Sequence, residues 1–292
     1  MLCPSAETNP SIASYLDLMK RCLTDSIYID DPLANFVEYH PKGWTPKWKR
    51  TALRLLGVAL AQHSIKLVQR NPHVFVNTED LSQVREGGMD VPVRAHTMIG
   101  LKRLDNLQFC VETAIRDGIP GDLIETGVWR GGACILIRGV LAAYGISDRL
   151  VYCADTFAGL PRPDPDYPAD KRDRLYKFSE LAISEETVRR NFAAYDLLDD
   201  QVVFLKGLFA DTLPQLSNKS FALIRLDGDM YGSTMSALAN LYERVSPSGF
   251  VIIDDYGGLR NCAKAVHDFL DQRGLRPAIQ PIDESCVWWQ KE

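Results

Sequence analysis

Strand and helix patterns alternate from residue 97 to the end of the chain, and this alternation constrains the fold more than any other feature. Short apolar runs that suit buried strands are separated by longer segments with apolar residues at helical spacing. We expect strands at 122–125, 150–154, 201–205, 221–226 and 249–253, helices at 101–117, 132–144, from 184 onward, 233–246 and 260–273, and extended runs at 278–282 and 286–290. This alternation predicts an α/β fold in which a parallel sheet has helices on both faces.

The first expected strand runs into a glycine-rich turn, Glu125-Thr126-Gly127-Val128-Trp129-Arg130-Gly131-Gly132. A glycine here lets the backbone turn tightly beside a ligand. Trp129 replaces the second glycine of the dinucleotide fingerprint and would obstruct a pyrophosphate, so a ligand without one fits better. The next strand ends at Asp155, where a carboxylate can accept hydrogen bonds from a ribose diol. The alternatives are a turn without a ligand and an acidic helix cap.

Two acidic clusters follow the last two central strands. One strand ends in Asp227-Gly228-Asp229 and the next in Asp254-Asp255, with one helix between them. Neighbouring parallel strands would place both clusters at one edge, where the carboxylates raise one another's pKa unless a cation neutralises them. Oxygen ligands select a hard cation such as Mg²⁺, with Ca²⁺ or Mn²⁺ as alternatives. The plain alternative is that these residues are caps and turn formers.

Composition excludes several classes of protein. The chain has 292 residues and a net charge of −5, which disfavours a nucleic-acid-binding protein because neutralising phosphates needs a basic face. Seven cysteines without a Cys-x-x-Cys pair argue against a disulfide framework or a zinc site and favour the reducing cytoplasm. The sequence also contains no pattern typical of a signal peptide or of a membrane-spanning helix.

Residues 46–70 differ from the rest of the chain. They include six basic residues and no acidic one, and Trp48, Leu55 and Leu67 belong to an apolar stripe at helical spacing. We expect a basic amphipathic helix. Such a helix can lie on an anionic membrane surface, but packing against the catalytic domain or a partner subunit is the favoured interpretation.

Four motifs in order resemble the macrocin O-methyltransferase family. They are residues 95–100 (AHTMIG), 122–132 (DLIETGVWRGG), 227–234 (DGDMYGST) and 253–256 (IDDY). The resemblance covers about residue 92 to the C-terminus and is weaker at 15–31. It implies a Rossmann-like S-adenosylmethionine methyltransferase fold with a mostly parallel sheet, an antiparallel C-terminal strand and a helical N-terminal extension. The implied division is an extension or lid over 1–92 and a methyltransferase domain over 93–292.

The resemblance also implies roles for individual residues. S-adenosylmethionine would be held by the turn and by the end of the second strand, Mg²⁺ by three aspartates, and Asp229 would be the general base. The implied cofactor-binding residues are Glu125, Thr126, Gly127, Val128, Gly131, Asp155 and Thr156, and the implied metal ligands are Asp227, Asp254 and Asp255. The implied acceptor is a sugar or diol-like hydroxyl of a small molecule or glycoconjugate, and the implied assembly is a homo-oligomer.

Three other functions are compatible with parts of the pattern. A metal-dependent nucleotide-sugar transferase also uses Asp-x-Asp, but it would leave residues 125–132 without a role. A haloacid-dehalogenase-like phosphatase would carry its first Asp pair after the first strand. A non-catalytic binding protein of the same fold is disfavoured because the four aspartates at 227, 229, 254 and 255 are intact.

Overall fold

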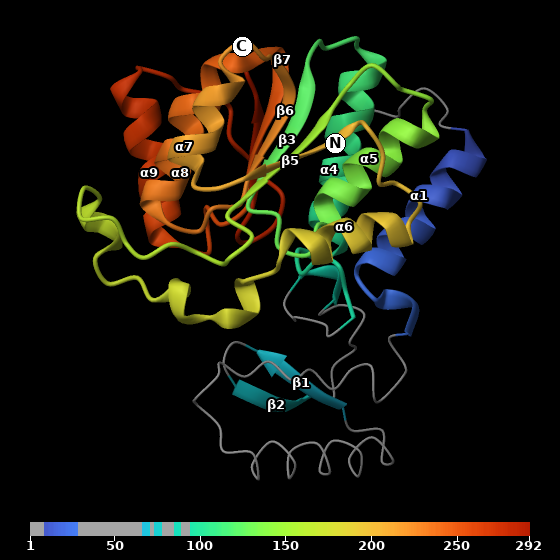
Figure 1. The fold of residues 1–292 in the computed structure, drawn as a ribbon, viewed down its shortest axis with the longest axis horizontal. Helices are drawn as coiled ribbons and strands as arrows, with labels where there is room; N and C mark the ends of the chain where they lie inside the picture. Colours follow the sequence, from blue (N-terminus) through green and yellow to red (C-terminus); the bar gives the residue numbers. More distant parts are fainter. Residues whose placement is uncertain (1–8, 29–65, 71–72, 78–84, 89–93) are drawn as a thin grey trace.

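A seven-stranded sheet forms the centre of the computed structural model, which describes residues 9–28, 66–70, 73–77, 85–88 and 94–292 (Figure 1). The strand order is β5-β4-β3-β6-β7-β9-β8, and the first five run parallel while β9 is antiparallel to both its neighbours. The strands are β3 Asp122–Thr126, β4 Val151–Asp155, β5 Val202–Lys206, β6 Phe221–Leu226, β7 Val245–Ile253, β8 Gln280–Pro281 and β9 Val287–Gln290. The predicted α/β fold with an antiparallel C-terminal strand is confirmed.

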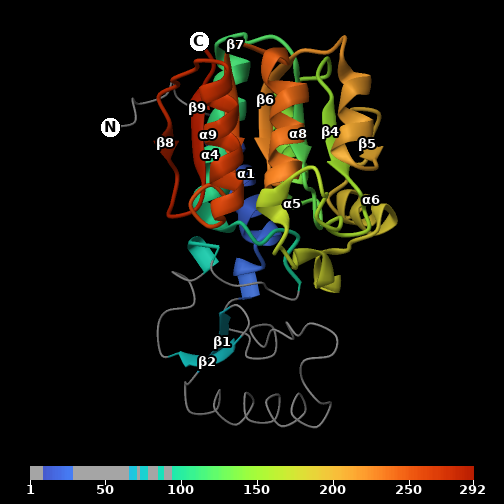
Figure 2. The same cartoon turned by 90° about the vertical axis from the view of Figure 1, so that its left-hand side faces the viewer.

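Helices cover both faces of this sheet and complete a three-layer arrangement (Figure 2). On one face, α1, α4 and α5 pack together, and α6 contributes Val188 and Phe192 to the same apolar cluster. On the other face, α8 and α9 pack against each other and α7 lies beside α8. The helices are α1 Pro10–Leu23, α4 Gly100–Arg116, α5 Gly132–Ala143, α6 Glu185–Ala194, α7 Phe209–Thr212, α8 Tyr231–Leu241 and α9 Arg260–Gln272.

Local sequence explains where the elements begin and which are buried. The hydroxyl of Ser184 accepts a hydrogen bond from the backbone N–H of Thr187, so it caps α6 as the sequence predicts. Strand β6 is buried along its whole length because it is the middle strand of the sheet and is covered by helices on both faces. The chain reverses its direction across the sheet between β3 and β6, and this switch point is where ligands bind in open α/β sheets.

Strand β7 corrects one prediction. We expected the helix before it to reach 246 and the strand to begin at 249, but α8 ends at Leu241 and β7 already begins at Val245. Val245 pairs with Phe221, and the register shifts before the next pairing at Phe250. The intervening Pro247 cannot donate a ladder hydrogen bond and therefore lies in this bulge, which local periodicity did not reveal.

The basic segment 46–70 is a second correction. Its last five residues, Lys66–Arg70, form strand β1, which pairs antiparallel with β2 at His73–Asn77, so a helix over 66–70 is wrong. The partner strand is rich in β-branched and aromatic residues, and cross-strand pairing with such a segment overrides a short helical pattern. Residues 46–65, on which the membrane-surface interpretation depends, lie outside the described residues. Within the described part of the chain, no helix has the length and apolar character needed to span a bilayer.

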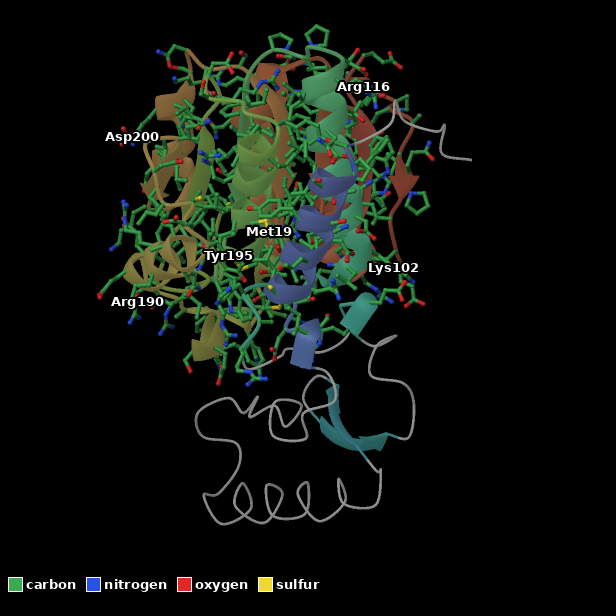
Figure 3. The ribbon with its side chains drawn as sticks, turned by 90° about the vertical axis from the view of Figure 1, so that its right-hand side faces the viewer. Met19, Lys102, Arg116, Arg190, Tyr195 and Asp200 are labelled. Atoms are coloured by element: carbon green, nitrogen blue, oxygen red, sulfur yellow. The ribbon has the colours of Figure 1, made fainter. Side chains whose placement is uncertain are left out.

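Helix α1 is part of the main hydrophobic core. Leu16, Met19 and Leu23 are buried in the same cluster as residues of α4 and α5, and Met19 lies against Gly139 of α5 (Figure 3). The backbone carbonyl of Leu23 accepts hydrogen bonds from His96 and Thr97. This helix is therefore anchored to the sheet domain by apolar packing and by backbone hydrogen bonds.

We predict that Leu16→Ala destabilises the whole sheet domain. The Leu16 side chain is fully buried, so truncation should lower the free energy of unfolding by about 2–5 kcal/mol. Leu18→Ala on the exposed side of the same helix is the matched control and should change it by less than about 0.5 kcal/mol. Urea unfolding monitored by circular dichroism provides the measurement. Equal effects of the two substitutions would show that α1 does not contribute to the core.

Candidate active site

A cavity of about 500 Å³ opens at the carboxyl ends of the parallel strands, where the topology predicts a ligand site. Its walls include the turn after β3, the end of β4, the acidic ends of β6 and β7, the loop at 158–173, the segment at 97–103 that leads into α4, residues 208–210 after β5, and the start of α8. Gly127, Asp155, Asp229 and Asp255 all line this one cavity. The two groups of residues that the sequence singles out are therefore brought together.

The turn after β3 requires a glycine at position 127. Gly127 has a φ of +89°, and a Cβ added there would lie 1.7 Å from the backbone oxygen of Asp227. The backbone N–H of Asp227 in turn donates to the carbonyl of Thr126, at 2.8 Å. The glycine-rich turn and the first acidic cluster are thus in direct backbone contact. Trp129 also has a positive φ, of +46°, and its ring lines the cavity.

Asp155 holds the turn after β3 in place. One carboxylate oxygen accepts from the backbone N–H of Val128 at 2.7 Å, and the other accepts from that of Phe157 at 2.7 Å. Burial raises the pKa of Asp155, although these backbone hydrogen bonds oppose the shift. The Thr156 hydroxyl also lies 3.4 Å from Oδ1, and the carboxylate as a whole lines the cavity in which a diol would lie.

The acidic ends of β6 and β7 meet as the sequence predicts, because these strands are neighbours in parallel register. One carboxylate oxygen each from Asp227, Asp254 and Asp255 lies within 4.8 Å of the other two. Asp229 adopts a φ of +59°, a conformation that side chains other than glycine rarely adopt, and its carboxyl hydrogen-bonds that of Asp255. Within the described part of the chain, Oδ2 of Asp255 is buried and has no hydrogen-bond partner.

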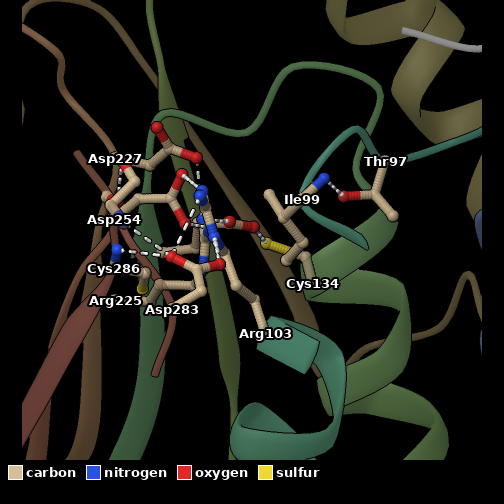
Figure 4. A network of polar contacts seen from close by, with 11 residues as sticks. Thr97, Ile99, Arg103, Cys134, Arg225, Asp227, Asp254, Asp283 and Cys286 are labelled. Atoms are coloured by element: carbon tan, nitrogen blue, oxygen red, sulfur yellow. Dashed lines mark hydrogen bonds and ion pairs between the residues drawn. The ribbon is translucent and has the colours of Figure 1, made fainter. Parts of the chain in front are cut away.

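Two arginines lie among these carboxylates (Figure 4). Arg225 is 1% exposed, and its guanidinium contacts Glu125 and Asp254 and donates to Asp227 at 2.9 Å. Arg103 of α4 donates to Asp254 at 2.6 Å and to Asp283 at 2.6 Å. The two guanidiniums fix the orientation of Asp254, one on each of its oxygens.

The arginines do not neutralise the cluster completely. Burial, together with the charge of Asp254, raises the pKa of Asp227 to about 6. Burial and the neighbouring Asp227 raise the pKa of Asp229 well above its ordinary value, and burial and Asp229 do the same for Asp255. These shifts arise first because burial removes the carboxyl groups from water and second because the neighbouring carboxylates repel one another.

The residues present fit both groups that the family resemblance implies. For a hard divalent cation, three carboxylates converge, and the buried Oδ2 of Asp255 has no hydrogen-bond partner. For a nucleoside without a pyrophosphate, a close backbone turn at Gly127 and a carboxylate at Asp155 border the same open cavity.

The other residues singled out at the turn have different positions. Val128 and Thr156 line the cavity, as does Glu125, whose carboxylate accepts from Cys134 Sγ at 2.8 Å and contacts Arg225. Burial raises the pKa of Glu125 to about 7, against the opposing charge of Arg225. Thr126 is fully buried, and Gly131 packs against Val188 of α6. Neither is among the residues that line the cavity.

Sequence reasoning missed the two arginines. A signal existed for Arg225, because a charged residue inside the apolar run of a central strand must be paired with opposite charge. For Arg103 and its partner Asp283 no such signal exists, since they lie 180 residues apart on a helix and a C-terminal loop.

We predict that Arg225→Met lowers the free energy of unfolding by about 3–5 kcal/mol at neutral pH, because it leaves buried carboxylates without their counter-charge. The pKa values of Glu125 and Asp227, already raised by burial, would then rise further in the folded state. An acid whose pKa is higher in the folded than in the unfolded state destabilises the fold at pH values above its unfolded pKa. The loss of stability in Arg225→Met should therefore become smaller as the pH falls from 7 towards 5. Urea unfolding at both pH values measures this.

Arg189→Met is the matched control, because Arg189 forms an exposed i,i+4 pair with Glu185. This substitution should lower the free energy of unfolding by less than about 0.5 kcal/mol. Similar costs for both variants would contradict a central role for Arg225.

Comparisons with known proteins agree with this geometry. A family model described as Macrocin-O-methyltransferase (TylF) matches residues 12–291. Mycinamicin III 3''-O-methyltransferase of Micromonospora griseorubida is 51% identical over 215 residues, 72% of this chain and 84% of that protein. A tetracenomycin 4'-O-methyltransferase of Streptomyces olivaceus is 46% identical over 278 residues, 94% of this chain and 92% of that protein.

A solved structure supports the same assignment. The O-methyltransferase NovP is 40% identical to this chain, and the two structures superpose with a TM-score of 0.77. The match covers 96% of this chain and 99% of NovP. The chain belongs to the macrocin O-methyltransferase family and is an O-methyltransferase.

Proposed function

We propose that this chain transfers a methyl group from S-adenosylmethionine to a hydroxyl on the sugar part of a natural product, with Mg²⁺ at the acidic ends of β6 and β7. The observation that carries the proposal is that Gly127 and Asp155 share one cavity with Asp227, Asp229 and Asp255. The residues proposed to bind the nucleoside and those proposed to bind the cation therefore border one cavity of a size that suits a small molecule.

The names of the relatives support a sugar hydroxyl as the acceptor. The Streptomyces olivaceus protein is named for the 4' oxygen of a tetracenomycin that carries a dimethoxy-rhamnosyl group. The Micromonospora griseorubida protein is named for the 3'' oxygen of mycinamicin III. A glycoside of this general kind is the proposed substrate class.

When bound, S-adenosylmethionine supplies an electrophilic methyl group and Mg²⁺ supplies a Lewis acid that lowers the pKa of an acceptor hydroxyl. Asp227, Asp254 and Asp255 would hold the cation, and Asp155 with the turn at Gly127 would hold the nucleoside. The Asp229 carboxylate would accept the proton of the hydroxyl, and its raised pKa makes it a stronger base than an ordinary aspartate. The walls of the cavity align the acceptor oxygen and exclude water.

The direct test is incubation with S-adenosylmethionine, Mg²⁺ and a panel of deoxysugar glycosides. Release of S-adenosylhomocysteine together with one added methyl group in the product, seen by mass spectrometry, is the expected result. A chain that uses no member of a panel containing mycinamicin-type and rhamnosyl glycosides would contradict the proposed substrate class.

We predict that Asp255→Asn lowers both Mg²⁺ affinity and turnover with little change in stability. Asp255 is the cleanest choice because Asp227 and Asp254 pair with Arg225, whereas among the described residues no arginine forms an ion pair with Asp255. The measurement is a Mg²⁺ titration by calorimetry, paired with an activity assay. EDTA should abolish wild-type turnover and excess Mg²⁺ should restore it, and full activity in EDTA would contradict a metal-assisted mechanism.

We predict opposite consequences for the two edges of the cavity. Asp155→Ala should weaken S-adenosylhomocysteine binding by about 1.5–3 kcal/mol, the range for hydrogen bonds to a charged group. Asp229→Asn should leave that binding unchanged while turnover collapses, because only the proton acceptor is lost. Calorimetric titration and initial rates separate the two effects, with the exposed Asp200→Ala as control. An unchanged dissociation constant in Asp155→Ala would reduce Asp155 to a residue that only holds the turn.

Two broader proposals rest on composition and on the family resemblance. We place the enzyme in the cytoplasm because its cysteine pattern suits a reducing compartment, and we propose that it assembles as a homo-oligomer. We also propose a division into an extension over 1–92 and a catalytic domain over 93–292. Helix α1 belongs to the extension in this division, although its apolar side chains pack into the core of the catalytic domain.

A further inference from the structure

The loop over 158–173, here called the strap, forms one wall of the cavity. Its residues Arg162, Asp164 and Tyr167 line the cavity together with Asp170. The strap follows β4, so it begins near Asp155, and it then runs to the face of the sheet that α8 and α9 cover (Figure 1). A loop without a long helix or strand of its own needs specific contacts to hold it there.

Asp170 supplies those contacts with an almost completely buried carboxylate, 1% exposed. One oxygen accepts from the backbone N–H of Tyr231 at 2.9 Å and from the Asn261 side chain at 3.0 Å. The other oxygen accepts from the backbone N–H of Gly232 at 2.8 Å. Asn261 also donates to the carbonyl of Ala169. The Asp170 carboxylate therefore makes most of the hydrogen bonds that fasten the strap to α8 and α9.

This carboxylate replaces the usual cap of α8. The N-cap residue, Met230, makes no side-chain hydrogen bond, so the first two N–H groups of the helix are satisfied by a residue some sixty positions earlier. The ring of Tyr167 lies on Gly232, where an added Cβ would come within 2.7 Å of it. Tyr167 and Tyr231 also pack ring to ring, with centroids 5.8 Å apart.

The start of α8 determines where Asp229 points. Only Met230 separates Asp229 from the first residue of the helix, and Asp229 has the unfavourable φ of +59°. The backbone N–H of Met230 donates to the carbonyl of Gly228 at 2.6 Å, which closes a tight turn around Asp229. Such a conformation persists only when the structure on both sides fixes it. On the helix side, Asp170 does this.

We propose that Asp170 is a positioning residue for methyl transfer. It fixes the first turn of α8 and thereby orients Asp229, and it also holds the strap in place as a wall of the cavity. The proposal rests on the proposed function. Both oxygens of Asp170 accept hydrogen bonds from α8 or α9, so we place its effect on Asp229 and on the strap.

The test compares Asp170→Asn, Asn261→Ala and the control Asp166→Asn in the full chain. An asparagine has only one acceptor oxygen, so its amide would face the N–H of a backbone donor and the clamp would open. Asn261→Ala removes one of the three donors to Asp170 and leaves the two backbone N–H groups of Tyr231 and Gly232 in place. Asp166 lies on the same strap but is exposed and is not among the cavity-lining residues.

Three quantities are measured for each variant: kcat and acceptor KM with the glycoside on which the wild type is most active, the dissociation constant for S-adenosylhomocysteine, and amide hydrogen exchange over 158–173 and 230–233. For Asp170→Asn we expect kcat to fall ~10²-fold, the effect of a misplaced catalytic group, and exchange to speed up in both segments. The dissociation constant should stay within twofold of wild type. Asn261→Ala should shift kcat and exchange in the same direction by less, and Asp166→Asn should match wild type.

Each other outcome overturns the proposal. If kcat of Asp170→Asn stays within twofold, or if exchange over 230–233 is unchanged, Asp170 does not position Asp229. A parallel loss of cofactor binding, kcat and thermal midpoint would mean a general structural role. If Asp170→Asn does not fold, a wild-type kcat in Asn261→Ala overturns the proposal. A wild type that methylates no glycoside refutes the proposed function itself, and the two failures are thus distinguishable.

Discussion

The burial of Arg225 is the interaction on which the rest of the active-site edge depends. Its guanidinium lies on the middle strand of the sheet, away from water, and contacts carboxylates from β3, from the end of β6 and from β7. Taking a cation out of water is costly, and only well-placed opposite charges with good hydrogen-bond geometry offset that cost. The buried charge is therefore tolerated only when β3, β6 and β7 keep their register. The same register places the carboxylates of the candidate active site.

The same network is compatible with the proposed cation site. In the described part of the chain, two guanidiniums, those of Arg103 and Arg225, lie among six acidic residues: Glu125, Asp227, Asp229, Asp254, Asp255 and Asp283. The arginines orient Asp254 and reduce repulsion enough for the chain to fold, while leaving an excess of negative charge. Burial is the main cause of the raised pKa of Asp227, and the charge of Asp254 adds to it. The proposed divalent cation at Asp227, Asp254 and Asp255 would reduce this negative charge.

Local sequence patterns predicted most of the sheet and the acidic edge, because each depends on short-range signals. An apolar run followed by a carboxylate identifies the end of a buried strand, and parallel topology then brings Asp227 and Asp254 together. The arginine partners, the bulge at Pro247 and the strand at Lys66–Arg70 depend on pairing with distant segments. Periodicity within one segment carries no information about such pairings, so these features become visible only in three dimensions.

The structure separates the fixed part of the site from the adaptable part. Asp227, Asp254 and Asp155 stand at the ends of strands in a covered sheet, where packing allows little movement. The strap, by contrast, is a loop whose position depends on a few hydrogen bonds around Asp170. Changes in the strap residues that line the cavity can therefore alter the shape offered to an acceptor while the carboxylates stay in place. Asp170 holds the strap to the start of α8, so its proposed role requires that such changes spare its contacts. On that proposal, the fit of an acceptor and the alignment of Asp229 would depend on the same residue.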